Sequence, residues 1–244
     1  MSTRPAPLDE LVHSRPQLNR LLAALPEPEW QRWQPELEWV AMPLGQVLHE
    51  PGRIVSHLHF PLTAIVSWIR LLENGDATQV AMTGKEGVIG VYLLMGAAHT
   101  RNRAVVQKAG TALRLRLSVV LGSFNQGNPV QQLFLRYTQT LITQMSQGAV
   151  CHRHHTLERQ LCSMLLLMLD RHDDDSIGLT HESMANLLGV RREGVTQAAK
   201  RLMNDGILSY SRGRIMVLNR AALAERACEC HSVIRDEERR LLTP

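Results

Sequence analysis

Apolar residues between positions 179 and 202 recur at spacings of three and four, which predicts two short helices joined by a tight turn. The predicted inward faces are Met184, Leu187 and Leu188 in the first helix, and Val195, Ala198, Ala199 and Leu202 in the second. Thr180 is placed to cap the first helix through its hydroxyl group, and Gly189 supplies the left-handed conformation that ends it. Polar and charged residues occupy the outward positions of the second helix. This arrangement is typical of a helix-turn-helix that sets side chains against base edges in the major groove of DNA.

A β-hairpin is predicted directly after the second helix, where two short apolar runs at 207–210 and 214–218 flank a turn at Gly213. A hairpin in this position is a wing, and Arg212 and Arg214 at its tip are placed to reach phosphate groups. The segment 179–220 contains seven arginine or lysine residues and three acidic residues, a net charge of +4 that equals the formal charge of the whole chain. Any helical hairpin needs a turn glycine and an apolar seam. The wing and the local positive charge are what favour DNA binding.

The N-terminal half has the pattern of a β domain. Apolar segments of about four to eight residues, from about 37 to 117, are separated by turn signals, which predicts an antiparallel roll or barrel. Asn74-Gly75 fits a two-residue hairpin turn, because both positions tolerate positive φ. A loose stretch through about Arg15 and two short helices precede the strands, and the second helix carries Trp30 and Trp33 towards the core.

A helix of about five turns is predicted from Pro129, a residue that suits a first helical turn. Its apolar stripe consists of Val130, Phe134, Tyr137, Leu141, Met145 and Gly148. Such an apolar stripe must pack against another surface, either the β domain or the same helix of a second chain. Small residues at Ser146, Gly148 and Ala149 allow two backbones to approach, so we favour a homodimer.

These segments together predict an α+β protein of three parts. The parts are an antiparallel β-roll sensor domain at 1–123, a dimerisation helix with a hinge at 124–155, and a winged helix-turn-helix domain at 156–244. Thr156 is placed to cap the first helix of the last part, and Asn219 to cap its last helix.

Composition indicates the setting in which the protein works. The longest apolar run, at 164–169, is too short to cross a bilayer, and no signal peptide precedes the four cysteines. We therefore expect a cytoplasmic protein with no membrane segment and no disulfide framework. The sequence shows no catalytic motif in a convincing context, whether a nucleophile elbow, a phosphate loop, an HExxH motif or a pair of carboxylates. We therefore expect no catalytic residues and no enzyme activity.

Two short stretches contain possible metal ligands. The first comprises Cys151, His152, His154 and His155. The donors of this stretch point in different directions around a helix axis. The second stretch contains Cys228 and Cys230, which are two residues apart on a predicted helix and so do not share a face. Each stretch taken alone favours buried or idle cysteines, so we expect no metal ion and no cofactor. The histidines of the β domain are expected to be solvated or hydrogen-bonded rather than haem ligands.

The order of the parts resembles the Crp/Fnr family of bacterial transcription regulators, with a cyclic-nucleotide-binding-like β-roll, a long dimer helix and a C-terminal winged helix-turn-helix. The resemblance covers nearly the whole chain and is strongest at 179–218, LTHESMANLLGVRREGVTQAAKRLMNDGILSYSRGRIMVL. Across the β domain it rests on layout rather than on a motif. It implies a homodimer that binds a pseudo-palindromic site in double-stranded DNA, contacts RNA polymerase and responds to a small-molecule effector.

The residues with which this family reads DNA fall on the second helix. Arg192 and Glu193 match the family's Arg-Glu pair, in which the arginine contacts guanine and the glutamate accepts from cytosine. Gln197 stands where a second base-reading arginine is common and predicts a different half-site, because glutamine pairs with adenine. Gly194 replaces the usual threonine, and we expect it to allow a close approach to the sugar-phosphate backbone. The expected DNA-binding residues are Arg191, Arg192, Glu193, Thr196, Gln197, Lys200, Arg212 and Arg214.

The effector region departs from the cyclic-AMP-binding members of the family. Those members hold the ribose and the cyclic phosphate with a Gly-Glu-x-Gly turn and an Arg-Ser/Thr pair. The corresponding residues here are Gly90, Val91, Arg103 and Ala104, so only the glycine and the arginine match. Glu86 would take the ribose role only in a shifted register that lengthens its distance to Arg103. Because two polar contacts are missing, we expect another effector in this region, or none, rather than cyclic AMP.

An alternative function remains open at this point. A protein that senses a metal or a small molecule and acts through a protein partner would use its helix-turn-helix for protein contacts alone. The cations on the second helix and the wing argue against it, because a protein-contact module does not need them along one edge. Binding to random DNA that weakens with salt would distinguish the two interpretations.

Overall fold

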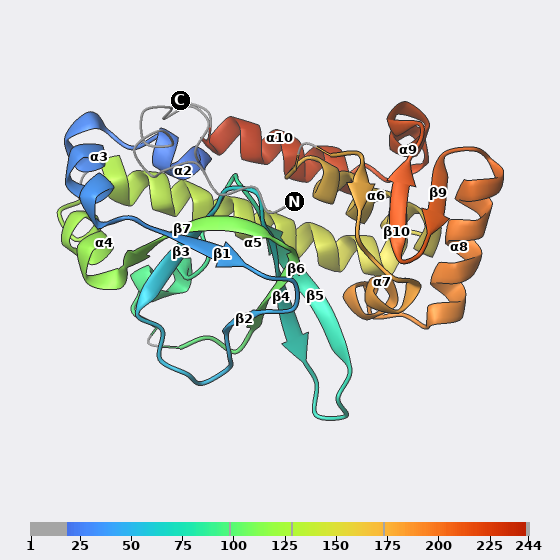
Figure 1. Cartoon of the computed structure of the whole chain (residues 1–244), viewed down its shortest axis with the longest axis horizontal. Coiled ribbons are helices and arrows are strands. Elements are labelled where there is room, and N and C mark those ends of the chain that lie inside the picture. Colours follow the sequence, from blue (N-terminus) through green and yellow to red (C-terminus); the bar gives the residue numbers. More distant parts are fainter. Residues whose placement is uncertain (1–18, 98, 128, 173, 243–244) are drawn as a thin grey trace, which may run out of the picture.

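The computed structural model describes residues 19–97, 99–127, 129–172 and 174–242. It consists of a β-roll and a C-terminal part, connected by the long helix α5 (Pro129–His154), which runs along both (Figure 1). The loose stretch predicted through Arg15 lies outside the described residues. Among the helices described, none combines the length and the apolar character that crossing a bilayer requires.

Two antiparallel sheets form the β-roll. One sheet has the order β1 (Glu38–Met42), β7 (Gly110–Arg116), β3 (His57–Pro61), and the other has the order β2 (Val47–His49), β6 (Arg103–Lys108), β4 (Ile65–Leu71), β5 (Ala77–Thr83). Alternate residues point into the core, as Leu58 and Phe60 of β3 and Leu113 and Leu115 of β7 illustrate. The antiparallel roll predicted from the spacing of turns is therefore confirmed.

The β4–β5 hairpin differs from its predicted turn. The backbone N–H of Leu72 donates to the carbonyl of Asp76 at 2.8 Å, and that of Gly75 donates to the carbonyl of Leu72 at 3.0 Å. Gly75 has a φ of +87°, whereas Asn74 does not have a positive φ. The loop thus has three residues, and the predicted two-residue Asn74-Gly75 turn is wrong. The Asn74 side chain accepts from the backbone N–H of Asp76 at 3.0 Å, a local bond that favours the longer loop.

Short helices flank the roll. They are α2 (Arg20–Ala23), α3 (Glu27–Trp33) and η2 (Gln34–Glu36) before β1, η3 (Val91–Met95) before β6, and α4 (Leu117–Phe124) after β7. The side chain of Asn19 caps α2 by accepting from the backbone N–H of Leu21 at 3.0 Å. Trp30 and Trp33 are buried as predicted, and the indole N–H of Trp33 donates to Ser123 Oγ at 3.0 Å, which ties α3 to α4.

Helix α5 packs most of its predicted apolar stripe against the β-roll. Val130, Phe134, Tyr137 and Leu141 are all buried within the chain. The hydroxyl group of Tyr137 donates to the carbonyl of Val88 at 3.2 Å, which fixes the helix on the roll. The β domain therefore covers the part of the stripe from Val130 to Leu141, and these four residues are not available as a dimer face.

The C-terminal part has its own core and is a winged helix-turn-helix. Its helices are α6 (Leu157–Leu169), α7 (His181–Leu188) and α8 (Arg192–Asn204), and its sheet has the order β8 (Ser176–Ile177), β10 (Arg214–Val217), β9 (Leu208–Ser211). Thr156 and Asn219 cap α6 and α9 as predicted. Strand β8 was not predicted, because its two residues are too few to give a pattern.

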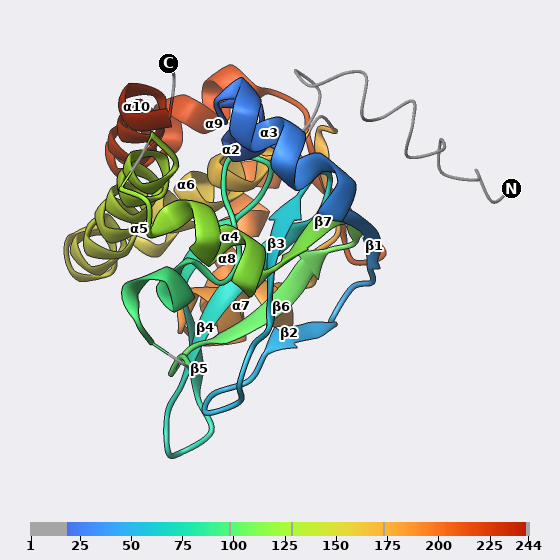
Figure 2. The ribbon, with the colours of Figure 1, turned by 90° about the vertical axis from the view of Figure 1, so that its left-hand side faces the viewer.

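The chain closes with two helices rather than the predicted one, α9 (Arg220–Arg226) and α10 (Cys230–Leu242). Helix α10 runs beside α5 and returns the chain to the β-roll (Figure 2). The buried guanidinium of Arg171, just after α6, binds Glu86 of the roll at 2.8 Å and also pairs with Glu238 of α10. The C-terminal part is therefore held against the roll by a polar contact as well as by packing.

Candidate nucleic-acid interface

The helix-turn-helix has the predicted local structure. Thr180 accepts from the backbone N–H of Ser183 at 3.0 Å at the start of α7, and Gly189 ends this helix with a φ of +64°. All seven apolar residues predicted to face inward are buried. The turn at Gly189 packs against the β4–β5 hairpin, because a Cβ atom on this glycine would lie 2.6 Å from the hydroxyl oxygen of Thr78.

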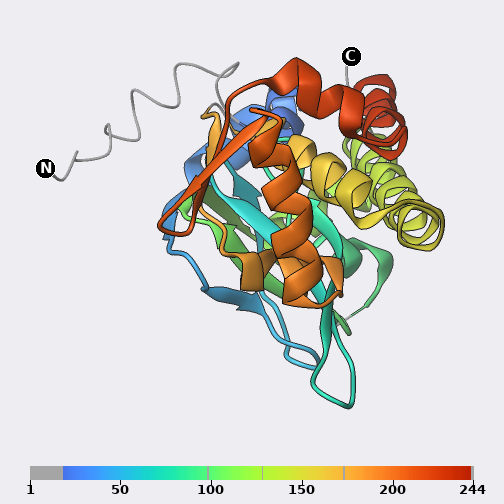
Figure 3. The ribbon, with the colours of Figure 1, turned by 90° about the vertical axis from the view of Figure 1, so that its right-hand side faces the viewer.

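Every residue predicted to bind DNA is exposed. Six lie on α8 or at its cap, and Arg212 and Arg214 lie on the wing. Helix α8 and the strands of the wing lie next to each other (Figure 3). The first residues of α7, the first turn of α8 and the tip of the wing surround one hollow, which is lined by Thr180, His181, Glu182, Arg192, Tyr210, Arg212 and Gly213. Arg192 and Arg212, which are distant in the sequence, therefore lie at the same hollow.

His181 is a residue of this hollow that the sequence pattern missed. Its ring stacks on Tyr210 of β9, with centroids 4.3 Å apart, and its Nδ1 atom lies 3.0 Å from Thr196 Oγ1. Thr196 Oγ1 itself donates to the carbonyl of Arg192 at 3.0 Å, so His181 must donate to Thr196. Burial and the nearby charge of Arg192 lower the pKa of His181 and favour this neutral form. His181 thus links α7, α8 and the wing, and the hydroxyl of Thr196 is already engaged within the chain.

The wing has a tight turn at its tip. Arg212 and Gly213 have φ values of +50° and +77°, and the flanking residues Ser211 and Arg214 pair directly. Two central residues with positive φ are the mark of a type I′ turn, whose twist matches that of paired strands. Among the described residues, Arg212 is the only one other than glycine with a positive φ. The turn thereby holds an arginine at the tip despite the backbone strain.

Gly194 has a packing role that the sequence did not indicate. A Cβ atom on this residue would lie 2.8 Å from Cδ2 of Leu157, the first residue of α6. Gly194 therefore faces α6, inside the C-terminal part, and its lack of a side chain allows two helices to approach. The close approach to the DNA backbone that the sequence suggested stays a prediction.

The predicted effector residues lie in the roll, and one of them, Val91, lines the pocket beside α5. Gly90 caps η3 with a φ of +105°, and Val91 and Ala104 are buried in the roll. Arg103 binds Glu50 through two nitrogens, at 2.8 and 2.6 Å, so its charge is already neutralised. Glu86 is buried, and its Oε1 atom accepts from Arg171 and from the backbone N–H of Gly84.

A pocket does exist beside these residues, between the roll and α5. Its lining includes Trp68, Val91, Tyr92, Thr138, Ile142 and Met145, but not Arg103. A pocket with aromatic and aliphatic walls and no cation offers nothing that would neutralise a cyclic phosphate. The effector therefore stays a prediction, and cyclic AMP remains the one we do not expect.

Two histidines of the roll, His49 and His59, are largely enclosed by it. Burial lowers the pKa of His49 to about 4 and that of His59 to about 3, and the proximity of the two rings adds to the shift at His59. His49 Nδ1 lies 3.2 Å from the hydroxyl oxygen of Tyr92. Both side chains are therefore neutral at pH 7.

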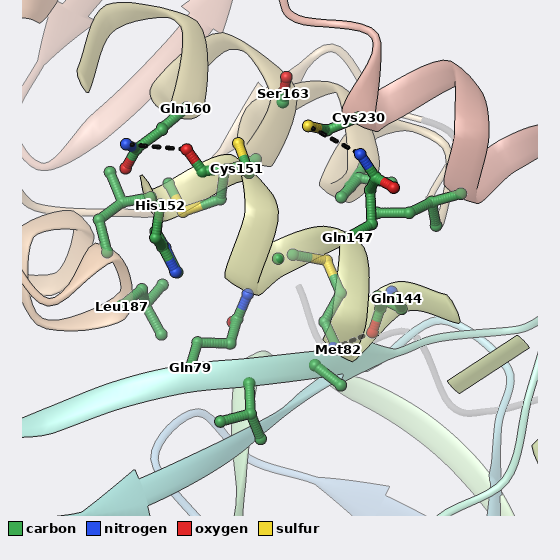
Figure 4. Close-up of a pocket in the computed structure, with 17 residues that line it drawn as sticks. Gln79, Met82, Gln144, Gln147, Cys151, His152, Gln160, Ser163, Leu187 and Cys230 are labelled. Carbon is green, nitrogen blue, oxygen red and sulfur yellow. Dashed lines mark hydrogen bonds between the residues drawn. The ribbon is translucent and has the colours of Figure 1, made fainter. Parts of the chain in front are cut away.

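A further pocket lies where β5 meets α5, α6, α7 and α10 (Figure 4). The residues that line it include Gln79, Met82, Gln144, Gln147, Cys151 and Leu187. The side chain of Gln144 accepts from the backbone N–H of Met82 at 2.8 Å and so joins α5 to β5. No residue predicted as a site residue lies in this pocket, because its walls come from five separate elements.

Comparison with known proteins identifies the helix-turn-helix domain and the overall fold. Residues 159–226 match the model of the Crp-like helix-turn-helix domain. No curated protein sequence matches the chain significantly. A Crp/Fnr-family protein from Eubacterium rectale has a similar structure with a TM-score of 0.67, 17% sequence identity, and coverage of 84% of this chain and 96% of that one.

Two further solved structures show the same fold. FixK2 from Bradyrhizobium japonicum has a TM-score of 0.65 and 16% identity, covering 79% of this chain and 98% of its own. A Crp/Fnr-family transcriptional regulator from Thermus thermophilus, TTHA1359, has a TM-score of 0.62 and 21% identity, covering 78% of this chain and 98% of its own. The chain thus carries a Crp-like helix-turn-helix domain and has the fold of the Crp/Fnr family of transcriptional regulators.

Proposed function

We propose that the protein is a homodimeric transcription regulator that binds a specific, pseudo-palindromic DNA sequence. The observation that carries this proposal is the hollow shared by α7, α8 and the wing, with Arg192 and Arg212 at its edge. A recognition helix and a wing that expose cations around one hollow fit the phosphate-lined major groove. Binding to chromosomal DNA would place the protein in the cytoplasm.

The exposed residues of this interface divide into two groups. Arg192, Glu193 and Gln197 lie in the first two turns of α8, the part of a recognition helix that contacts bases, and match guanine, cytosine and adenine respectively. The remaining cations are placed to contact phosphates, and they are Arg191, Lys200, Arg212 and Arg214. Sequence specificity therefore depends on the three base-contacting residues, whereas DNA affinity depends on these three and on the four phosphate-contacting cations.

The proposed dimer face is the outward side of α5. Leu135, Thr138, Ile142, Met145 and Ala149 follow one another at alternating spacings of three and four, the repeat of a coiled-coil seam. Leu135 is 50% exposed and Ile142 is 54% exposed in the single chain. Pairing two copies along this seam would bury these side chains and present two copies of α8 on a two-fold axis.

The pocket beside α5 offers a way for an effector to act on the dimer. Thr138, Ile142 and Met145 belong both to the wall of this pocket and to the proposed dimer seam. A small apolar or aromatic molecule in the pocket would therefore contact the roll and the dimer helix together. We propose that such an effector changes the separation of the two recognition helices by shifting α5.

The test of DNA binding is a selection of duplexes from a random library, followed by anisotropy titrations of the selected site at several salt concentrations. We expect an inverted repeat whose half-sites are about one helical turn apart, with an affinity that falls steeply as salt rises. Failure to enrich any sequence, together with binding that does not weaken with salt, would contradict the proposal and favour a module for protein contacts.

A further inference from the structure

Four possible metal ligands meet at the junction between α5 and the C-terminal part. One donor atom from each of Cys151, His155, Cys228 and Cys230 lies within 4.8 Å of the other three. The Sγ atoms of Cys151 and Cys228 are 3.5 Å apart, and Nδ1 of His155 is 3.3 Å from Sγ of Cys230. The three cysteines are buried and free, and they form a small cluster separate from the two main cores.

The chain brings these residues together from two distant segments. Cys151 lies in the last turn of α5 and His155 directly follows this helix, and the backbone N–H of His155 donates to the carbonyl of Cys151 at 3.0 Å, which keeps the two residues on one side. Cys228 lies in the link between α9 and α10, and Cys230 begins α10. Because Cys228 precedes the helix, the rule that residues two apart on a helix diverge does not apply to this pair. The packing of α10 along α5 then joins the two pairs (Figure 2).

The distances in the cluster match those of a tetrahedral metal site. Bonds of about 2.3 Å to sulfur and about 2.0 Å to nitrogen place two sulfur ligands about 3.8 Å apart, and a sulfur and a nitrogen ligand about 3.5 Å apart. The sulfur pair in the cluster differs from its value by about 0.3 Å and the sulfur–nitrogen pair by about 0.2 Å, which small side-chain rotations would correct.

Side chains next to the cluster hydrogen-bond to its donor residues, as outer side chains do around a bound metal ion. Nε2 of His155 lies 3.3 Å from Oε1 of Glu229, so the carboxylate holds the ring with Nδ1 turned towards the sulfur atoms. The side-chain amide of Gln147 donates to Sγ of Cys230 at 3.2 Å, as an outer hydrogen bond to a metal-bound sulfur atom does (Figure 4). Ser163 Oγ lies 3.1 Å from Sγ of Cys228 and accepts from the backbone N–H of the same residue.

We propose that Cys151, His155, Cys228 and Cys230 bind one Zn²⁺ ion as a closed, structural Cys₃His site. Three thiolates and an imidazole in tetrahedral reach are the ligand set that zinc prefers among the divalent metals of the cell. On binding, each thiol that is still protonated loses its proton to the solvent, and no electron is transferred. His152 and His154 are exposed and His231 binds Asp170, so none of them belongs to the site.

The position of the site gives the ion a mechanical role. It would fasten the last turn of α5 to the start of α10, next to the bend at which α5 passes into α6. The metal would therefore fix the angle between the long helix and the winged helix-turn-helix. The existence of the site does not depend on the proposed binding of DNA, since metal content is measured on the protein alone.

The first experiment is elemental analysis of the full chain purified without a metal-affinity tag. We expect about one zinc per chain, and about one Co²⁺ per chain after chelation and titration with cobalt, with the visible absorption typical of tetrahedral cobalt–thiolate centres. A chain that holds far less than one zinc even after titration with Zn²⁺, or an octahedral cobalt spectrum, would overturn the proposal. So would isolation of a Cys151–Cys228 disulfide that contains no metal.

Matched variants identify the ligands. Cys228→Ala and Cys230→Ala should each lower zinc content at least several-fold, whereas Cys162→Ala should retain it, because Cys162 is buried in α6 outside the cluster. Equal zinc content in all three variants would contradict the assignment. His155→Cys provides a test that does not rely on loss, because it should retain one metal and strengthen the thiolate-to-cobalt absorption, whereas His155→Ala should weaken binding.

Discussion

The guanidinium of Arg171 lies 2.8 Å from the carboxylate of Glu86, and both side chains are almost completely buried. Arg171 also pairs with Glu238 of α10, so removing it leaves two carboxylates without their cation. We expect Arg171→Met to lower the free energy of unfolding by about 3–5 kcal/mol, as for other buried pairs that lose one partner. Urea unfolding followed by circular dichroism measures the change.

The exposed pair of Arg240 and Glu237 is the matched control for this prediction. It lies three residues apart on α10, and Arg240→Met should change stability by less than about 1 kcal/mol. Similar unfolding midpoints for Arg171→Met and the unmodified chain would contradict the assigned role of Arg171.

The elements that were predicted correctly depend on short stretches of sequence. Thr180 and Gly189 mark the ends of α7 because capping and left-handed turns involve only adjacent residues. The contact of Arg171 with Glu86 joins residues 85 positions apart, and no local pattern reports it. The same is true of Cys151 and Cys228, which are 77 positions apart, so each half of the cluster was unconvincing by itself.

Helix α5 shows a second limit of prediction from a pattern. Its sequence carries apolar residues on two faces, one containing Phe134 and Leu141, the other containing Leu135 and Ile142. Periodicity marks both faces as suitable for burial but does not say which one the roll covers. The structure assigns the first face to the roll and leaves the second exposed.

Arg192→Ala should abolish sequence preference while leaving weak, salt-sensitive binding to any duplex. Loss of a bidentate contact to guanine costs about 1–3 kcal/mol of discrimination, which is about 5- to 150-fold in the ratio of specific to random affinity. Arg239→Ala, at an exposed position on α10 far from α8 along the chain, is the control and should bind as the unmodified chain does. Unchanged discrimination by Arg192→Ala in competition gel shifts would contradict the prediction.

Gln197→Arg should change the preferred half-site rather than weaken binding. Glutamine matches adenine, and arginine matches guanine, so repeating the selection with the variant should replace adenine by guanine at one position of each half-site. Gln197 is exposed on α8, and the substitution should leave the fold intact. An identical selected sequence for both proteins would show that Gln197 does not contact a base.

Ile142→Glu should dissociate the proposed dimer. It places a carboxylate at the centre of the exposed seam on α5, and in the dimer each copy would face the other across the two-fold axis. Ile142→Leu keeps the apolar surface and should remain dimeric. Sedimentation equilibrium at micromolar concentration distinguishes the two variants, and a monomeric unmodified chain under these conditions would exclude this face as a stable interface.

Acid should destabilise the fold through two histidines of the roll, the buried His49 and the half-buried His59. Their pKa values, about 4 for His49 and about 3 for His59, lie below the value of about 6.5 expected in the unfolded chain. The unfolded chain therefore binds more protons between these values, so the stability that neutral burial provides is complete above about pH 6.5 and declines as pH falls towards 4. Each histidine should account for a loss of about 2 kcal/mol between pH 7 and pH 5.

Urea unfolding at pH 7 and at pH 5 tests this dependence. His49→Gln and His59→Gln should each reduce the difference in unfolding free energy between the two pH values, and the double variant should reduce it further. His99→Gln, at an exposed position, is the control and should leave the difference unchanged. Glutamine does not titrate, so the double variant lacks any contribution of the two histidines to the pH dependence. If the double variant and the unmodified chain show the same pH dependence, the fold does not hold these histidines neutral.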